Sequence, residues 1–154
     1  MTDTGTTAKQ TDAEAVDIRM ALRKIYVKDI SFESPNTPDI FDGRGMADVR
    51  PTMKTNVGTS FNARSDDEYE VILRLNVHAV LDDDSSLFLV EVSQGGTFVL
   101  PGLSGAVLNE TINVRCCRVL FPFAREAVWT LVSRGGLPPL LLQEIDFEAL
   151  YSQI

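Results

Sequence analysis

Cysteine and histidine are scarce in this chain of 154 residues, which holds two cysteines and one histidine. The cysteines, Cys116 and Cys117, are adjacent, and sequence neighbours rarely form a disulfide because the required geometry is strained. Zinc sites need spaced cysteine and histidine ligands, so we expect no structural zinc site. The sequence predicts two reduced, buried thiols, with neither a bound metal nor a cofactor.

Long apolar runs are also missing. No segment approaches the length of a membrane-spanning helix, and the polar N-terminus contains no apolar signal-peptide segment. We therefore expect a cytoplasmic protein that does not insert into membranes. Residues 1–20 are predicted to form a flexible polar leader, and residues 21–154 a single domain.

Basic residues are in deficit, with 14 lysines and arginines against 22 acidic residues and a formal net charge of −8. Nucleic-acid-binding proteins usually carry a basic patch that contacts phosphates. The composition therefore argues against nucleic acid as a partner. An acidic surface instead favours solubility and contact with basic partners.

Motifs for catalysis are absent from the sequence. His78 is the only histidine, and no serine or cysteine nucleophile motif accompanies it. The glycine-rich segment 95–105 lacks the P-loop lysine and the dinucleotide-binding spacing, and "DDDSS" at 82–86 lacks the later ligands of a calcium loop. We predict no enzymatic activity and no catalytic residue. The rival interpretation is a hydrolase or small-ligand enzyme in which His78 meets carboxylates.

Alternating apolar residues predict four strands, at about 22–33, 49–59, 69–81 and 87–94. The "DDDSS" turn joins the third and fourth strands as an antiparallel hairpin. Two faces are expected in the first strand, with Tyr26, Ile30 and Phe32 on one and Asp29, Ser31 and Glu33 on the other. A long glycine-rich connection, read as a crossing segment, is expected over 95–109.

The apolar spacing changes to a helical period in residues 112–136. Arg134 and the glycines at 135–136 mark the end of this helix, and Pro122 is expected either to start it or to kink it. Asp146 is the predicted N-cap of a short helix over 147–153. Strands followed by helices predict an α+β fold with an antiparallel sheet.

The helix around Trp129 is apolar on more than one side, which is more than one sheet can cover. It is either a core helix covered by the sheet and loops or part of a subunit interface, and we favour the interface. Apolar loops near 98–103 and 137–142 add to this surface. The combination is typical of a protein that binds extended apolar peptide.

Four segments carry a family resemblance: "IYVKDISFESPNTPDIF", "YEVILRLNVHAVL", "LFLVEVSQGGTF" and "LFPFAREAVWTLVSRGGLPPLLLQEIDFEALY". In order and spacing they resemble the SecB protein-export chaperones of bacteria over residues 23–152. The resemblance implies a four-stranded antiparallel sheet, a long main helix and a short C-terminal helix. It also implies a homotetramer built as a dimer of dimers.

The function implied by the resemblance is ATP-independent holding of unfolded precursor proteins and their delivery to the SecA ATPase. The alternative is a SecB-like chaperone dedicated to another client, such as a toxin–antitoxin partner. Many family members add a mobile acidic tail that makes a second contact with SecA. This sequence ends at Ile154, so the expected SecA contact is the one on the sheet.

Two sets of site residues follow from the resemblance. An acidic patch for SecA is expected at Asp29, Glu33, Leu89 and Glu91. Client-groove candidates are Phe98, Leu100, Leu103, Leu140, Phe147, Leu150 and Tyr151. Retention of the acidic patch favours export over the alternative client.

Overall fold

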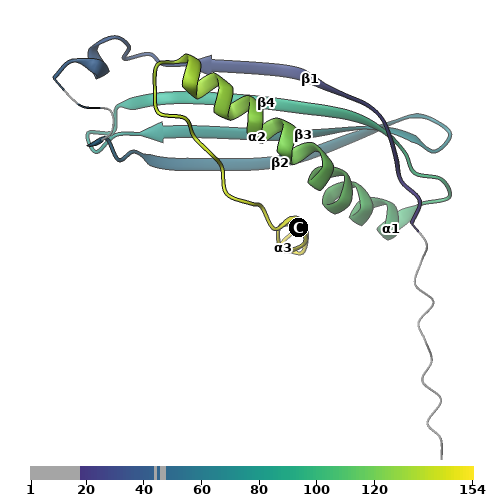
Figure 1. Ribbon diagram of the computed structural model, residues 1–154. Helices are drawn as coiled ribbons and strands as arrows, with labels where there is room; N and C mark the ends of the chain where they lie inside the picture. The colour runs from purple at the N-terminus through teal and green to yellow at the C-terminus, as the bar shows by residue number, and fades with distance from the viewer. Residues whose placement is uncertain (1–17, 44, 46–47) are drawn as a thin grey trace, which may run out of the picture.

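The structure, a computed structural model, describes residues 18–43, 45 and 48–154. Four antiparallel strands form one sheet, and helices pack on one of its faces (Figure 1). The strands are β1 (Ala21–Glu33), β2 (Thr52–Ser65), β3 (Glu68–Val80) and β4 (Ser86–Val99). The predicted α+β fold, with a long helix and a short C-terminal one, is confirmed. Most of the predicted leader, residues 1–17, lies outside the described residues.

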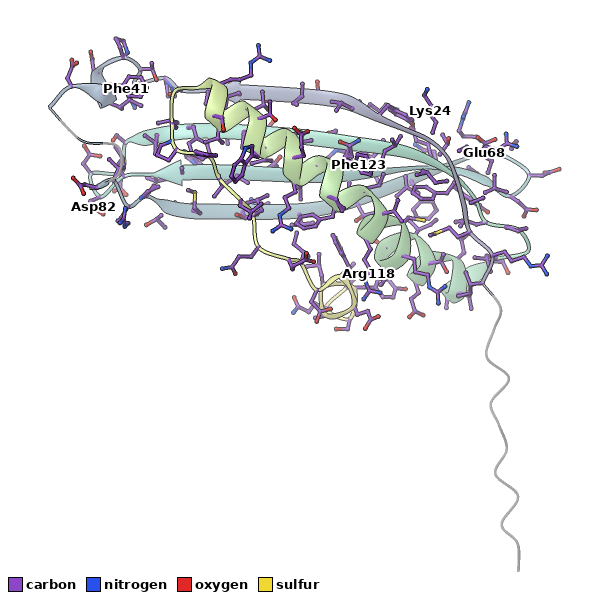
Figure 2. The ribbon with its side chains drawn as sticks, in the orientation of Figure 1. Lys24, Phe41, Glu68, Asp82, Arg118 and Phe123 are labelled. Carbon is purple, nitrogen blue, oxygen red and sulfur yellow. The ribbon has the colours of Figure 1, made fainter. Side chains whose placement is uncertain are left out.

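The strand order is β1-β4-β3-β2, which places β1 and β2 at opposite edges of the sheet. The connection from β1 to β2 therefore has to pass one end of the sheet, and its described part, residues 34–43, 45 and 48–51, includes the short 3-10 helix η1 (Asp39–Phe41). Phe41 and Asp82 of the β3–β4 turn both lie at this end (Figure 2). The prediction that residues 95–109 form one long crossing connection is wrong, because residues 95–99 belong to β4 and residues 105–110 are helical.

Two strands are longer than the sequence pattern predicted. β2 continues past residue 59 to Ser65 because it pairs with β3 along that whole length. β4 continues through Gly95 and Gly96 to Val99 and is paired on both sides. A glycine inside a strand marks a close approach of another group. At Gly96 that group is Leu120, whose Cδ2 would lie 2.9 Å from an added β-carbon.

The prediction that Tyr26 shares a face with Ile30 and Phe32 is also wrong. β1 pairs with β4 from Val27↔Gln94 directly to Asp29↔Ser93, which leaves Lys28 as a β-bulge. An extra residue shifts the alternation of a strand by one. Tyr26 therefore lies on the same face as Asp29, whereas Phe32 lies on the helix side and stacks on Phe88 with ring centroids 6.1 Å apart.

The helical layer begins earlier than the pattern predicted. It runs through α1 (Gly105–Glu110), the π-helical segment η3 (Thr111–Cys116) and α2 (Cys117–Arg134), which lies along the sheet (Figure 1). Pro122 lies inside α2 and does not start it. The Gly135 amide donates to the Leu131 carbonyl at 3.0 Å, which confirms the predicted helix end.

An extended segment follows α2 and leads to α3 (Phe147–Tyr151). The predicted N-cap is confirmed, since Asp146 Oδ1 accepts a hydrogen bond from the Ala149 amide at 3.1 Å. An exposed ion pair links α2 to α3, with 2.9 Å between an Arg118 guanidinium nitrogen and Glu148 Oε1; Arg118 can be located in Figure 2. The core lies between sheet and helices and includes Val71, Leu73, Leu75, Val77, Val90, Val92, Leu120, Ala124 and Val128, all nearly or fully buried.

Candidate functional site

The face of the sheet opposite α2, here called the outer face, carries no helix of the described chain (Figure 1). Strand pairing sets three residues of β1 beside three of β4 on this face. The pairs are Asp29↔Ser93, Ser31↔Glu91 and Glu33↔Leu89. The sheet therefore gathers the four residues expected to contact SecA, Asp29, Glu33, Leu89 and Glu91, on one surface formed by two adjacent strands.

Three carboxylates lie on this surface. Asp29, Glu33 and Glu91 are exposed, and Leu89 is half-buried beside them. Among the residues that the structure describes, none of these three carboxylates forms an ion pair. A basic partner would therefore not have to break an internal ion pair, and Leu89, which pairs with Glu33 at one end of the surface, would give it an apolar contact there.

His78 lies on the outer face next to Leu89. Its Nε2 atom is 3.1 Å from the Ser86 hydroxyl, and this hydrogen bond links the two strands of the hairpin. No carboxylate contacts His78 within the described ranges, so the enzyme interpretation lacks the convergent groups it requires. The same part of the chain contains no cluster of histidine, cysteine, aspartate or glutamate that could hold a metal ion.

Three of the predicted client-groove residues lie in the core. Phe98 is fully buried on the helix side of β4 rather than in a loop, and Leu100 follows it at zero exposure. Phe147 is buried and packs its ring edge against Phe121, with centroids 5.9 Å apart. In this conformation Phe98 and Leu100 stabilise the fold and are not available to a client, whereas Phe147 also forms part of the wall of a cleft.

The other four candidates are partly exposed, and three of them line clefts. Leu140 belongs to one cleft, and Leu150 and Tyr151 to another. Leu103 lies before α1, at the opposite end of the helical layer from Leu140. The accessible apolar side chains of the predicted set therefore lie in two clefts, with Leu103 apart from both.

The first of these, here called the connection cleft, lies where the crossing chain meets the segment after α2. It encloses about 150 Å³ and is lined by Val49, Pro51, Met53, Leu87, Phe88, Leu137, Pro138, Pro139 and Leu140. Of these residues, only Leu140 was predicted from the sequence. They come from three separate stretches of the chain, 49–53, 87–88 and 137–140, which meet only in the folded structure.

The second, here called the C-terminal cleft, lies between β2 and α3. It encloses about 160 Å³ and is lined by Val57, Gly58, Thr59, Asn113, Phe147, Leu150, Tyr151 and Ile154. Met53 of the connection cleft and Val57 are four residues apart on the helix side of β2, about 13 Å in an extended strand. Because β2 is an edge strand, an extended chain lying along it would pass both clefts.

Cys116 and Cys117 are fully buried beneath the helical layer, as predicted. Burial raises the pKa of Cys116 to about 12, with a smaller contribution from Cys117. It also raises the pKa of Cys117 to about 11, although a hydrogen bond with Thr59, 3.2 Å from the sulfur, partly opposes this. Both thiols therefore act as small apolar core groups.

Both thiols are expected to stay unmodified by a thiol reagent at pH 8 and to react rapidly once urea unfolds the chain. Their folded pKa values exceed the ordinary value of 9, so the protonated thiols favour the folded state. Stability should be constant below about pH 9 and fall as the pH rises through 11 to 12. Urea denaturation between pH 7 and 11 measures this, and a Cys116→Ala, Cys117→Ala chain should lose less stability over that range.

No helix in the described parts of the chain is both long and apolar enough to cross a membrane. Comparison with known proteins gives a consistent family assignment. The family model "Preprotein translocase subunit SecB" matches residues 12–154. The sheet, its helical layer and the match to this family model together define the protein as one with the SecB fold.

Two curated relatives, both called protein-export protein SecB, support this. The one from Marinobacter nauticus is 40% identical over 88% of this chain and 79% of its own length. The one from Nitrosococcus oceani is 42% identical over 96% of this chain and 88% of its own length. The chain belongs to the SecB family.

A solved structure shows the same fold at a lower level of similarity. It is the SecB-like chaperone Rv1957 of Mycobacterium tuberculosis in complex with a ChAD peptide from the HigA1 antitoxin. It matches with a TM-score of 0.67 and 17% identity, over 83% of this chain and 91% of the other. At that identity the likeness supports the fold alone.

Proposed function

We propose that this SecB-family chain is an ATP-independent holdase in the bacterial cytoplasm that keeps precursor proteins unfolded and delivers them to the SecA ATPase. The single observation that carries the proposal is the pair of protein-export relatives, at 40% and 42% identity over most of the chain. Two different surfaces would serve the two partners. The clefts along β2 would bind the client, and the outer face would bind SecA.

Client binding would use apolar burial in the connection cleft and the C-terminal cleft. Their walls are mainly aliphatic and aromatic, which suits clients of many sequences because the hydrophobic effect has no direction. The free edge of β2 adds backbone hydrogen bonds that do not depend on the client's sequence. Each contact alone is weak, and a long client that engages several of them gains avidity.

Assembly into a homotetramer, a dimer of dimers, would cover apolar groups that one chain leaves exposed. On the helix side of β1, Val27 and Ile30 are 48% and 41% exposed. On α2, Phe123 and Trp129 are 47% and 41% exposed, and Phe123 can be located in Figure 2. Six residues turn a helix by about 600°, so these two side chains point roughly 120° apart. Two separate apolar surfaces suit two kinds of subunit contact.

A single substitution in the connection cleft tests client holding. Met53→Asp is expected to weaken protection of an unfolded client from aggregation roughly tenfold, because a buried methionine contributes about 1.5–3 kcal/mol of apolar burial. Light scattering of a chemically unfolded precursor, diluted into buffer with the chaperone, measures the concentration required for protection.

The matched control is Asn56→Asp, which adds the same charge to the same strand on the outer face. It should protect the client as well as the wild type. Equal protection by both variants would remove the cleft from the proposal. Sedimentation of the same samples checks assembly, and a monomer at micromolar concentration would contradict the tetramer.

A chaperone dedicated to a toxin–antitoxin partner is not favoured over export. The structure that pairs a SecB-like chaperone with an antitoxin peptide shares 17% identity with this chain. The relatives that share 40% and 42% are export proteins.

A further inference from the structure

A cluster on the outer face joins β1 to β3 across β4. The Tyr26 hydroxyl donates a hydrogen bond to Glu70 Oε2, and Lys28 Nζ lies 2.7 Å from Glu70 Oε1. Both donors come from β1 and the acceptor from β3, so these contacts pass over the strand between them. Among the described residues, this is the one ion pair that links two strands which are not neighbours.

The strand beneath has no side chain at the crossing point. Tyr26 pairs with Gly95, which in turn pairs with Ile72 of β3. A β-carbon at Gly95 would overlap the Tyr26 ring. The absence of that carbon lets the ring lie flat over β4 and bring its hydroxyl to Glu70. Gly95, Tyr26 and Glu70 therefore form one structural unit.

The two donors lie at the bulge of β1: one is the bulged residue itself and the other precedes it. Lys28 is one of two residues of β1 without a partner in β4, the other being Arg23, and Tyr26 lies two residues before Lys28. The bulge makes the step from Tyr26 to Asp29 an odd number of residues while both side chains stay on the outer face. Without the bulge, and with Tyr26 still facing outward, Asp29 and Glu33 would point toward α2, and Ile30 and Phe32 outward.

We propose that Tyr26, Lys28 and Glu70 form a clamp that fixes the bulge at Lys28 and so positions Asp29 and Glu33 on the surface that meets SecA. The inference rests on the proposed function, because it deepens the role of that surface. The three clamp residues are positioning residues, and the contact with SecA is made by the acids beyond the bulge.

Within one chain β1 lies at the edge of the sheet and pairs only with β4, so contacts that reach β3 give it a second attachment. An edge strand with one partner can shift its register at low cost, and each one-residue shift exchanges its two faces. Contacts to an ionised carboxylate are stronger than neutral ones. Glu70 stays ionised because hydrogen bonds from Lys28 and Tyr26 lower its pKa. These contacts therefore select one register of β1.

The test uses the full chain with two variants, Tyr26→Phe, which changes no charge, and Glu70→Gln, which removes the ion pair with Lys28 and the negative charge that the Tyr26 hydroxyl contacts. Hydrogen exchange of amides 27–33, followed by mass spectrometry, reports the register of β1, and SecA affinity reports docking. Both variants should accelerate exchange in that segment and weaken SecA binding roughly fivefold, the equivalent of one ordinary intramolecular hydrogen bond. Client protection should stay unchanged.

Two further variants separate positioning from surface charge. Lys24→Gln removes one charge from the outer face of β1 without touching the clamp, and it should leave exchange and affinity unchanged. The double exchange Lys28→Glu, Glu70→Lys restores an ion pair of opposite sense and should slow the exchange that Glu70→Gln accelerates.

Each outcome decides a separate point. Unchanged exchange in Tyr26→Phe and Glu70→Gln would overturn the clamp. Faster exchange with wild-type SecA affinity would overturn its positioning role. A wild-type chain that fails to bind SecA would contradict the proposed function and the docking role together, while the exchange rates would still decide whether the clamp holds the bulge.

Discussion

Replacing Glu91 with lysine is expected to weaken binding to SecA by at least about tenfold, because close charge pairs at an interface contribute upwards of about 1.5 kcal/mol each. Glu91 is exposed on the outer face of β4, one strand away from Asp29 and Glu33. Its reversal puts a cation at the centre of an acidic surface and repels a basic partner. Adding Asp29→Lys should bring the loss to roughly a hundredfold.

The fold should not change, because both side chains project from the sheet without an internal ion pair in the described chain. The measurement is SecA affinity at two salt concentrations. Wild-type affinity should fall with salt and the affinity of Glu91→Lys much less, since exposed charges are screened over about 10 Å at 0.1 M.

The control is Asp66→Lys, the same change of charge in the exposed turn between β2 and β3. It should bind SecA within about twofold of the wild type, since it lies far along the sheet from the acidic surface. If Asp66→Lys and Glu91→Lys lose affinity equally, net charge rather than the outer face governs the interaction. Unchanged affinity in the Asp29, Glu91 double variant would remove the acidic surface from the proposed function.

Gly96→Val is expected to lower the free energy of unfolding by about 2–3 kcal/mol, the cost of overpacking a close-packed core. An added β-carbon would lie 2.9 Å from Leu120 Cδ2 and 3.0 Å from Phe98 Cε2, and both side chains are fully buried. Both lie in the close-packed core, so relieving the overlap requires neighbouring core groups to shift. The thermal midpoint should fall by roughly 5–10 °C for a chain of this size.

Gly58→Val is the matched control. Gly58 is also a strand glycine, yet a β-carbon added to it on the outer face of β2 would have no atom within 4 Å. A branched side chain there should be neutral or slightly stabilising, because glycine in a strand costs conformational entropy. Equal losses at both positions would show that backbone propensity, rather than contact with α2, requires glycine at Gly96.

Structural features that depend on residues close in the sequence, namely the helix ends and the hairpin, were predicted correctly. The end of α2 was predicted from Arg134 and the two glycines after it, and the start of α3 from Asp146, because capping depends on groups within four residues. The hairpin of β3 and β4 followed from alternation on both sides of a polar turn. The family resemblance in the same residues extended these predictions to the whole fold.

Features that depend on distant partners were not predicted. Gly95 and Gly96 indicated a loop, because their need for close contact with Tyr26 and Leu120 is visible only when three elements meet. Phe98 looked like a loop residue for the same reason, although it is core. Met53, which lines the connection cleft, gave no signal, because the cleft forms only when three separate stretches of the chain meet in the folded structure.

The sequence by itself determined the order of strands and helices, the helix ends, the acidic character of the first strand and the absence of catalytic motifs, since these depend on local pattern and composition. The tertiary structure alone decided which face each half of β1 presents. One unpaired residue, Lys28, reverses the alternation, and its place is set by pairing with β4 and by Glu70, 42 residues away. Local periodicity contains no information about such a partner, because the energy that fixes the bulge arises only after the sheet has formed.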